Sequence, residues 1–307
     1  MSFPGSAASW LDRFRNHYLL ENLRGGLRLY LSDRMTAFFL VVFCILVFFA
    51  IFGPTLAPYE YDEVQRSADG QILLTQPPSA DHWLGTNARG YDVLSRLVYG
   101  AQPTLLTGFL GGAIIVGLGL LVGVSAGYFG GRTDSVLMRL TDFAYGIPLI
   151  PAAIVIVAYF GIGFWTSILI IGMVLWRGNA RVFRSQVLQI KEREHVKAAK
   201  MLGASDRYVI VRHILPNMGG MIVLFFALGT GLTILISAGL AFLGFMDPFI
   251  PSWGIMLRTA YGSGQVADAW WWTLPSGLAI SISVLTVFML GRGYERVSQT
   301  DVNEVQA

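Results

Sequence analysis

The chain has 307 residues, of which 54% are hydrophobic and only 13% are charged, and its formal net charge is +3. Soluble domains carry about 25% charged residues, so this composition excludes an ordinary soluble protein. A single cysteine, Cys44, excludes an internal disulfide, and four scattered histidines argue against a structural zinc site.

The first long apolar run begins near Met35, after a polar lead. It is longer than the roughly 7–15 apolar residues of a signal peptide, so we expect a retained transmembrane helix. Uncharged runs follow at 97–131, 143–176, 216–246 and 269–291. At about 1.5 Å per residue, one helix over 143–176 would measure about 50 Å, against a hydrocarbon core of about 30 Å. We therefore expect two spans there, broken at Gly161-Ile162-Gly163, with the first beginning near Val136.

The predicted fold is thus all-α and membrane-integral, with six transmembrane helices and both termini on one side. The expected divisions are an N-terminal tail (1–34), a first transmembrane helix (35–56), an external segment (57–101), a five-helix core (102–291) containing a loop at 186–216, and a C-terminal tail (292–307).

Lysine and arginine placement predicts the orientation of these spans. Of the 22 Lys and Arg residues, only Arg66, Arg89, Arg96 and Arg258 fall on one side, and the other 18 lie on the side of the termini and the loop at 186–216. Positive charge marks the cytoplasmic side, so both termini and this loop should be cytoplasmic. Orientation and contact with anionic lipid account for the basic residues without a nucleic-acid partner.

The membrane edges carry two further features. Trp270-Trp271-Trp272 stands just before the last span, where tryptophans usually anchor a helix in the interface; stacking on a sugar-like substrate is the alternative. Asp142 and Arg139, at the other edge, are expected to form a local ion pair.

Inside the spans, Gly119, Gly123 and Gly127 recur every four residues and predict a close helix contact, either static or sliding. Thr230, Thr233 and Ser237 share one face of the fifth span. They are candidates for lining a polar pathway, and interhelical hydrogen bonding is the alternative. No span has an ionisable residue at its centre, which argues against an ion-coupled carrier.

Two classes of enzyme site are missing from the sequence. It contains no His-Glu-x-x-His zinc motif and no Gly-x-x-x-x-Gly-Lys-Ser/Thr phosphate-binding loop. We therefore expect no enzyme activity, no metal and no bound cofactor in this chain, and any ATP chemistry must come from another chain.

The loop at 186–216 is the most informative segment. Val196, Ala199 and Leu202 fall at helical spacing and predict a small apolar face. Gly203 allows a sharp turn, and Ser205 or Asp206 can cap a second helix, which would lead to a span that starts at Pro216. This pattern predicts a helix–Gly–helix element whose Ala198-Ala199 knob docks into a partner; a surface-lying amphipathic loop is the alternative.

Lys197-Ala198-Ala199, Gly203 and His213-Ile214-Leu215-Pro216 resemble the "EAA" loop of ABC importer permeases, with Lys197 where that family usually has Glu. The resemblance implies an ATPase-coupling loop. Its residues would be Glu194, Lys197, Ala198, Ala199, Gly203, Ala204, Ser205, His213, Leu215 and Pro216.

Three further segments narrow this resemblance. They are His82-Trp83-Leu84-Gly85-Thr86 with Asp92-Val93-Leu94-Ser95-Arg96-Leu97, then Gly127-Tyr128-Phe129-Gly130-Gly131, and Pro251-Ser252-Trp253-Gly254. These resemble the second ("C") permease subunit of the dipeptide/oligopeptide and nickel subfamily, some of whose members carry oligosaccharides. An ion-coupled carrier and a structural scaffold are the competing classes.

The resemblance implies a type I importer fold in a prokaryotic cell membrane. The expected partners are a homologous permease, two ATPase subunits that bind ATP and Mg, an extracytoplasmic substrate-binding protein, and membrane lipid.

Overall fold

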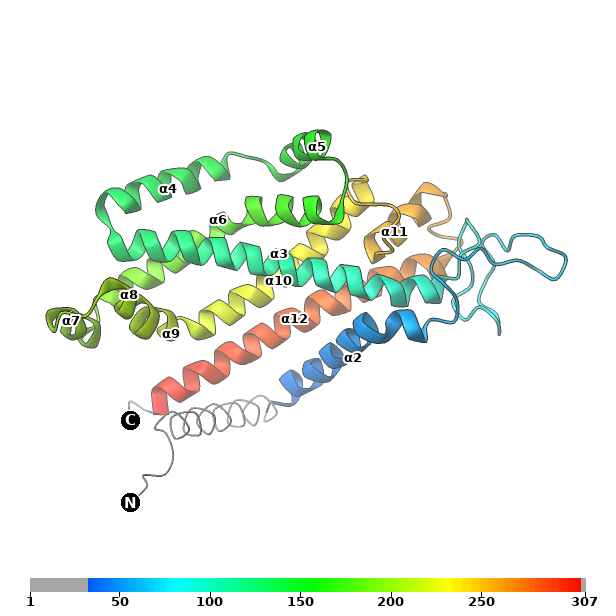
Figure 1. The fold of residues 1–307 in the computed structure, drawn as a ribbon. Coiled ribbons are helices and arrows are strands. Elements are labelled where there is room, and N and C mark those ends of the chain that lie inside the picture. Colours follow the sequence, from blue (N-terminus) through cyan, green and yellow to red (C-terminus); the bar gives the residue numbers. More distant parts are fainter. Residues whose placement is uncertain (1–32, 305–307) are drawn as a thin grey trace, which may run out of the picture.

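The structure is a computed structural model that describes residues 33–304, with side chains as far as Arg296. It is a helical bundle (Figure 1). Its helices are α2 (Arg34–Leu56), α3 (Val93–Phe129), α4 (Gly131–Tyr145), α5 (Leu149–Phe160), α6 (Phe164–Lys191), α7 (Glu194–Met201), α8 (Asp206–Val209), the π-helix η1 (Ile210–Ile214), α9 (Leu215–Asn217), α10 (Gly219–Leu243), α11 (Trp253–Gly262) and α12 (Trp270–Glu304).

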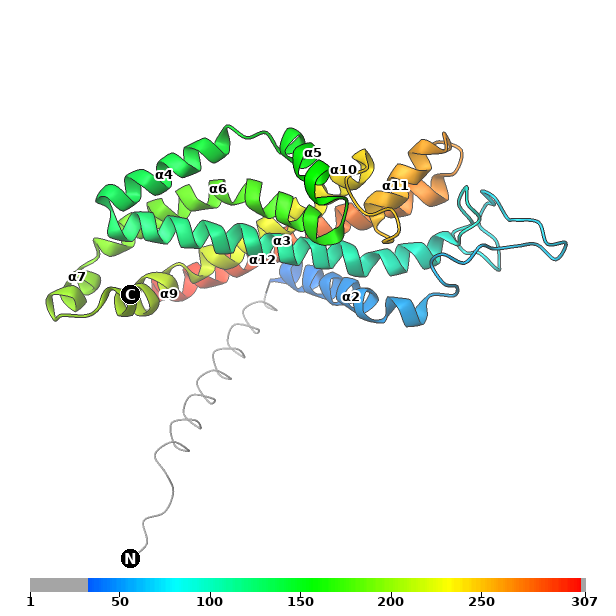
Figure 2. The same ribbon diagram turned by 45° about the horizontal axis from the view of Figure 1, so that its top comes forward.

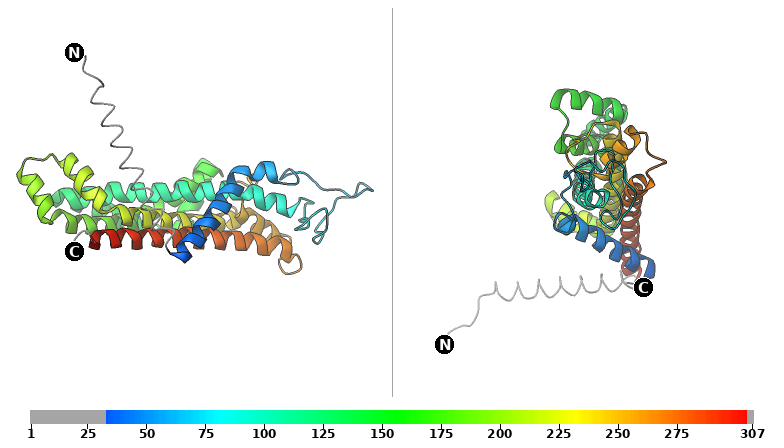
Figure 3. Two further views of the ribbon diagram at one scale, coloured as in Figure 1. Left: turned by 90° about the horizontal axis from the view of Figure 1, so that it is seen from below. Right: turned by 90° about the vertical axis from the view of Figure 1, so that its right-hand side faces the viewer.

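The long helices α3, α6, α10 and α12 run along one direction (Figure 1). Helices α7, α8 and α9 gather at one end of the bundle, called here the α7 end, and the segment 57–92 and α11 lie at the opposite end, called the loop end. Helix α2 crosses the bundle obliquely, in contact with α3 and α12 (Figure 3). Helices α4 and α5 lie along the outside of α6 (Figure 2).

The contact between α3 and α6 is built on the predicted glycine stripe. A Cβ added to Gly119 would lie 2.7 Å from Asn179 Cβ, and one added to Gly123 would lie 2.5 Å from the carbonyl oxygen of Ala180. Gly127 is as tightly placed, since its added Cβ would lie 2.9 Å from the carbonyl oxygen of Arg184. Only hydrogen fits between these backbones, so the glycines set the distance between the two helices.

Four helices in the described part of the chain are long and apolar enough to cross a membrane, namely α2, α3, α10 and α12 as far as Arg296. A fifth span would be formed by α4 and α5 together. The expected break between spans at Gly161–Gly163 is present, because α5 ends at Phe160 and α6 begins at Phe164. Helix α6 has an uncharged first half, but charges begin at Arg177. The count of six spans therefore stays a prediction.

The span expected to begin near Val136 is not one straight helix, because α4 and α5 are bent by 88° at residues 146–148. Pro148 has no backbone N–H and disfavours helix at the residue before it, which explains the break. The Arg177 side chain crosses from α6 to donate hydrogen bonds to the carbonyl oxygens of Ala144 and Ile147. It thereby satisfies acceptors that the end of α4 leaves open.

The ion pair expected between Asp142 and Arg139 is also wrong. Asp142 pairs instead with Arg181 of α6 at 2.5 Å, and Asp134 forms a two-fold contact with Arg184 at 2.5 and 2.6 Å. Helical neighbours three residues apart were the simplest partners by sequence. Helix α6 lies beside α4 and places Arg181 opposite Asp142, a long-range contact that the local sequence does not reveal.

The loop end has its own hydrophobic core, which the sequence patterns did not predict. Helix α11 lies within the segment expected to be an external loop, and it buries Trp253, Ile255 and Met256. Trp272 is 1% exposed and belongs to this core, and the Trp271 indole donates to the carbonyl oxygen of Thr86 at 3.4 Å. The expectation that the three tryptophans are interfacial anchors is therefore wrong for Trp272, and for Trp270 and Trp271 it stays a prediction. The physical reason is that α11 and the segment 57–92 cover the end of α12.

Candidate functional site

The loop between α6 and α10 begins with a short helix that ends at a glycine. Helix α7 stops at Met201, and Gly203 has φ +85°, in the left-handed region where glycine carries no steric cost. The turn is closed by Gly203 N–H to the Lys200 carbonyl at 3.0 Å and by Ala204 N–H to the Ala199 carbonyl at 3.1 Å. Such paired bonds satisfy the last carbonyls of a helix, so the turn after α7 has a defined geometry.

The second helix starts where the sequence predicted. Ser205 is the N-cap of α8, with its hydroxyl accepting from Tyr208 N–H at 3.3 Å. The chain then remains helical through η1 and α9, and α10 begins at Gly219, three residues beyond the expected start at Pro216. The π-helical turn widens the chain's path just before this long helix.

The loop is packed firmly onto the ends of α3 and α6. Val196, Val209 and Ile214 are buried, and they join a core that contains Tyr128 of α3 and Phe183 of α6. The packing is mostly of branched aliphatic groups, which have few rotamers in a helix. The loop is therefore built to move together with these helix ends.

Polar contacts fix the same junction. The Tyr128 hydroxyl donates to Asp206 Oδ1 at 2.7 Å, and Lys200 Nζ lies 3.7 Å from that oxygen and 4.7 Å from the centre of the Tyr128 ring. Lys191 Nζ donates to the Gly127 carbonyl at 2.8 Å. Both helices of the loop are thus tied to the end of α3.

Lys197, the residue that departs from the EAA pattern, forms an ion pair with Glu192 at 2.8 Å. The hydrogen bond from this ammonium lowers the pKa of the Glu192 carboxyl below its usual value. Both side chains are at least half exposed, so the pair contributes little to stability. The pair nevertheless offsets the positive charge that Lys197 would otherwise present to a partner.

The apolar face predicted from Val196, Ala199 and Leu202 is split by the structure. Val196 is 1% exposed, while Leu202 is 88% exposed and Met201 is 83% exposed. The reason is that α7 ends at Met201, so Leu202 turns away from the helical face. Of the predicted knob, Ala198 is exposed and Ala199 is half-buried. The apolar tip is therefore Met201-Leu202, which sequence reasoning missed, although two apolar residues directly before a C-terminal glycine are its signal.

The structure brings the remaining loop candidates to the same end of the bundle. Exposed positions are Glu194, Lys197, Ser205 and Pro216, and half-buried positions are Ala204, His213 and Leu215. Glu194 lies in the first turn of α7, where a negative charge complements the helix dipole.

The hydroxyl residues of α10 are buried. Thr230 and Thr233 are 0% exposed and face α3, where a Cβ added to Gly112 would lie 2.6 Å from Thr230 Oγ1. Thr233 Oγ1 donates back to the Gly229 carbonyl at 2.7 Å, and no hydrogen bond of Thr230 Oγ1 is formed within the described residues. These two threonines lie inside a helix contact, and their role in a pathway stays a prediction.

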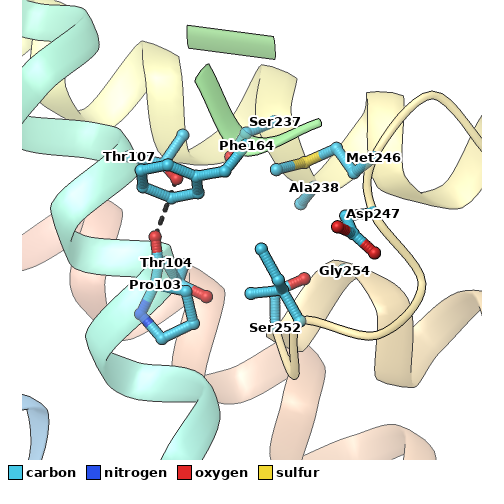
Figure 4. A pocket seen from close by; sticks show the side chains of 11 residues that line it. Pro103, Thr104, Thr107, Phe164, Ser237, Ala238, Met246, Asp247, Ser252 and Gly254 are labelled. Carbon is cyan, nitrogen blue, oxygen red and sulfur yellow. Dashed lines mark hydrogen bonds between the residues drawn. The ribbon is translucent and has the colours of Figure 1, made fainter. Parts of the chain in front are cut away.

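Ser237, one turn further along α10, borders a small pocket near the loop end (Figure 4). Thr104 and Thr107 of α3 and Ser252 also line it, and Thr107 donates to the Pro103 carbonyl at 2.7 Å. Phe164 and Met246 close its other side. The pocket has room for about one water molecule, and its wall combines hydroxyl and apolar groups with the carboxylate of Asp247.

Two family descriptions match this chain. Residues 119–299 match "Binding-protein-dependent transport system inner membrane component", and residues 24–78 match "N-terminal TM domain of oligopeptide transport permease C". The first match includes the whole loop between α6 and α10.

Individual relatives cover most of the chain. The dipeptide transport system permease protein DppC of Bacillus subtilis is 37% identical over 265 residues, which are 85% of this chain and 79% of that protein. The glutathione transport system permease protein GsiD of Pectobacterium atrosepticum is 33% identical, with 81% of each chain covered. The oligopeptide transport system permease protein OppC of Bacillus subtilis is 31% identical over 73% of this chain and 72% of that one.

Among solved structures, a chain of the MetNI methionine ABC transporter in an inward-facing conformation matches with a TM-score of 0.55 and 18% identity. The match covers 66% of this chain and 96% of that chain. At this identity the likeness shows the fold, that of an ABC importer permease.

Proposed function

The chain belongs to the family of binding-protein-dependent transport system inner membrane components, and from this we propose that it carries peptides across a cell membrane, driven by partner ATPases that dock on the loop between α6 and α10. It is a multi-pass membrane protein and the permease component of an ABC importer. Membership implies ATPase and substrate-binding partners in general. The peptide substrates, the docking site and the pairing with a homologous permease are the finer parts of the proposal.

The proposed docking site rests on one observation, the exposed tip Met201-Leu202 at the end of a well-packed loop. An apolar tip that is more than four-fifths exposed would be costly as a free surface feature, and it is the kind of anchor that fills a partner's pocket. The turn at Gly203 and the buried residue Val196 hold the tip in place. The site therefore consists of α7, the turn after it and α8.

The relatives support peptides as the substrate class, since dipeptide, oligopeptide and glutathione permeases all match over most of their length. Under this proposal the α7 end faces the cytoplasm, where the basic residues of α6 and α7 are concentrated. The segment 57–92 then faces the extracytoplasmic side and the substrate-binding protein. ATP and Mg are held by the ATPase subunits, and this chain supplies no catalytic residue.

The proposed mechanism is a population shift between two arrangements of the helices. ATP binding closes the ATPases and moves the docked tip, and the core around Tyr128 and Phe183 passes that motion to the ends of α3 and α6. Helix α2 stands apart from this core, and its many exposed apolar side chains, including Phe38, Val41 and Ile51, are placed to contact lipid.

The test is assembly and uptake by the complete importer in proteoliposomes. Leu202→Asp should weaken co-purification of the ATPases at least tenfold, because burial of a leucine side chain is worth about 1.5–3 kcal/mol and a buried carboxylate adds a desolvation cost. Leu74→Asp is the matched control, since Leu74 is 51% exposed at the loop end, and it should assemble normally. Normal ATPase binding and dipeptide uptake by Leu202→Asp would refute the docking site. An assembled wild type that imports no peptide would refute the substrate class alone.

A further inference from the structure

A cavity of about 600 Å³ opens at the loop end of the bundle. Its wall is formed by the segment 87–96, the turn before α6, the residues that follow α10, and α11 and α12. Its volume lies within the roughly 300–1,000 Å³ typical of small-molecule sites. It is far larger than the pocket beside Ser237 and separate from the coupling loop.

The charge of this cavity is entirely positive. Arg89, Arg96 and Arg258 line it, and none of its lining residues is Asp or Glu. Within the residues that the structure describes, none of these three guanidinium groups forms an ion pair. Only four Lys and Arg residues fall on this side of the membrane by sequence, and three of them meet here. Positive residues usually concentrate on the cytoplasmic side of a membrane protein, so three arginines around one cavity on the opposite side point to a function.

The side chain of Arg96 and the backbone of Arg89 are held in position by their surroundings. Arg96 is 8% exposed, donates to the Tyr61 carbonyl at 2.9 Å and lies 5.0 Å from the centre of the Tyr91 ring. Arg89 stands on a backbone turn fixed by the buried side chain of Asn87, whose Oδ1 accepts from Arg89 N–H at 2.8 Å and Tyr91 N–H at 3.0 Å. The remaining guanidinium donors are left available for a ligand.

Arg258 reaches the cavity from α11. Its guanidinium lies against the backbone of Gly244, where an added Cβ would be 2.9 Å from Nη2. No hydrogen bond of this side chain is formed within the described residues. Its position over the C-terminus of α10 is electrostatically favourable and orients it toward the cavity.

A fourth donor in the wall has no partner. Trp272 is 1% exposed and lines the cavity, and its Nε1 has no hydrogen-bond acceptor among the described residues. An indole N–H can only donate, and leaving it buried and unpaired costs about 1–3 kcal/mol. The wall therefore presents three guanidinium groups that lack an acceptor of negative charge, while the indole N–H of Trp272 lies beneath its surface.

We propose that this cavity receives the carboxylate of the transported solute as it enters the importer, and, resting on the proposed function, that this group is the free α-carboxylate of a peptide. Arginine matches a planar carboxylate with paired N–H groups. A small solute fits the geometry better than an acidic protein surface does. Arg96 is buried, so only a group that enters the cavity can reach it, while Arg89 and Arg258 are exposed at the cavity wall.

The test compares two probes in the complete importer with one and the same binding protein. The probes are dialanine, with a free carboxylate, and its C-terminal amide, and the readout is the ratio of their uptake rates. The double variant Arg89→Gln, Arg258→Gln should lower the ratio of acid to amide uptake roughly tenfold or more, since hydrogen bonds to charged groups are strong. Arg66→Gln is the matched control, because Arg66 donates to the Gly70 carbonyl at 3.1 Å and lies outside the cavity wall.

The outcomes separate this inference from the proposed function. A ratio that is unchanged in the double variant would overturn the inference. If both probes slow equally while the KM for loaded binding protein rises, the arginines receive that protein's acidic residues, and the inference is likewise overturned. A wild type that moves neither probe would instead contradict the proposed peptide function. A fall in the ratio in the double variant and not in Arg66→Gln is the result we expect.

Discussion

Substitution of Gly203 measures how much the conformation of the turn after α7 contributes to ATPase docking. A Cβ added at Gly203 meets nothing within 4 Å, so a side chain there encounters no clash inside this chain. The cost comes from φ +85° alone. In this left-handed region a residue with a Cβ has a conformational cost of about 1–2 kcal/mol. The cost is larger for a β-branched residue and smallest for asparagine. At 1.4 kcal/mol for each factor of ten, Gly203→Ala should depopulate the turn about 5- to 30-fold relative to other local conformations.

The assay is titration of the ATPase subunits onto the purified permease pair, followed by uptake in proteoliposomes. Because docking must restore the turn, the apparent affinity should fall by the same factor as its population. We expect the order Gly, Asn, Ala, Val from strongest to weakest binding, with the membrane helices intact in all four. Equal binding by Gly203→Val would refute the role of the turn. If Gly203→Asn binds the ATPases as weakly as Gly203→Val, then the partner leaves no room for a side chain at this position. In that case the argument from backbone conformation is wrong.

Lys197→Glu is the second comparison for this loop. It restores the residue usual in the EAA pattern and removes the ion pair with Glu192, which is exposed and contributes little to stability. Assembly and uptake should therefore stay close to wild type. A strong loss would show that the partner groove is matched to lysine.

Two further predictions concern the membrane helices. A reporter fused after Arg193 should read cytoplasmic and one at Asp69 should read external, and reversed labelling would contradict the proposed orientation. Gly123→Val should separate α3 from α6 and lower the thermal stability of the purified complex by several degrees, because its Cβ would lie 2.5 Å from a carbonyl oxygen of α6. Gly117→Val has nothing within 4 Å of its Cβ and should leave the melting temperature unchanged.

The sequence was most informative where a local rule governs the structure. The break at Gly161–Gly163, the cap at Ser205, and the packing glycines of α3 depend on short-range geometry and were predicted correctly. The 88° bend at residues 146–148 follows from a local rule as well, but an unbroken apolar run concealed it.

Features that depend on long-range contacts could not be predicted in this way. Asp142 had a nearby candidate in Arg139, and the choice of Arg181 depends on how α6 lies beside α4. Trp272 has the composition of an interfacial anchor, and its burial results from α11 folding over the end of α12. The gathering of Arg89 and Arg96 with Arg258 joins two segments that lie far apart in the chain.

Helix α3 acts as a lever between the two ends of the molecule. At about 1.5 Å per residue its 37 residues measure about 55 Å, and it carries Tyr128 in the coupling core at one end and Arg96 in the cavity wall at the other. A tilt of about 5° would move one end by about 5 Å relative to the other, comparable with a one-turn shift of a helix. Pro103 removes one backbone hydrogen bond within α3, so bending is easiest there, beside the pocket that Ser237 borders. Under the proposed mechanism, a push on the tip of α7 that tilts α3 would move Arg96 relative to Arg258 on α11.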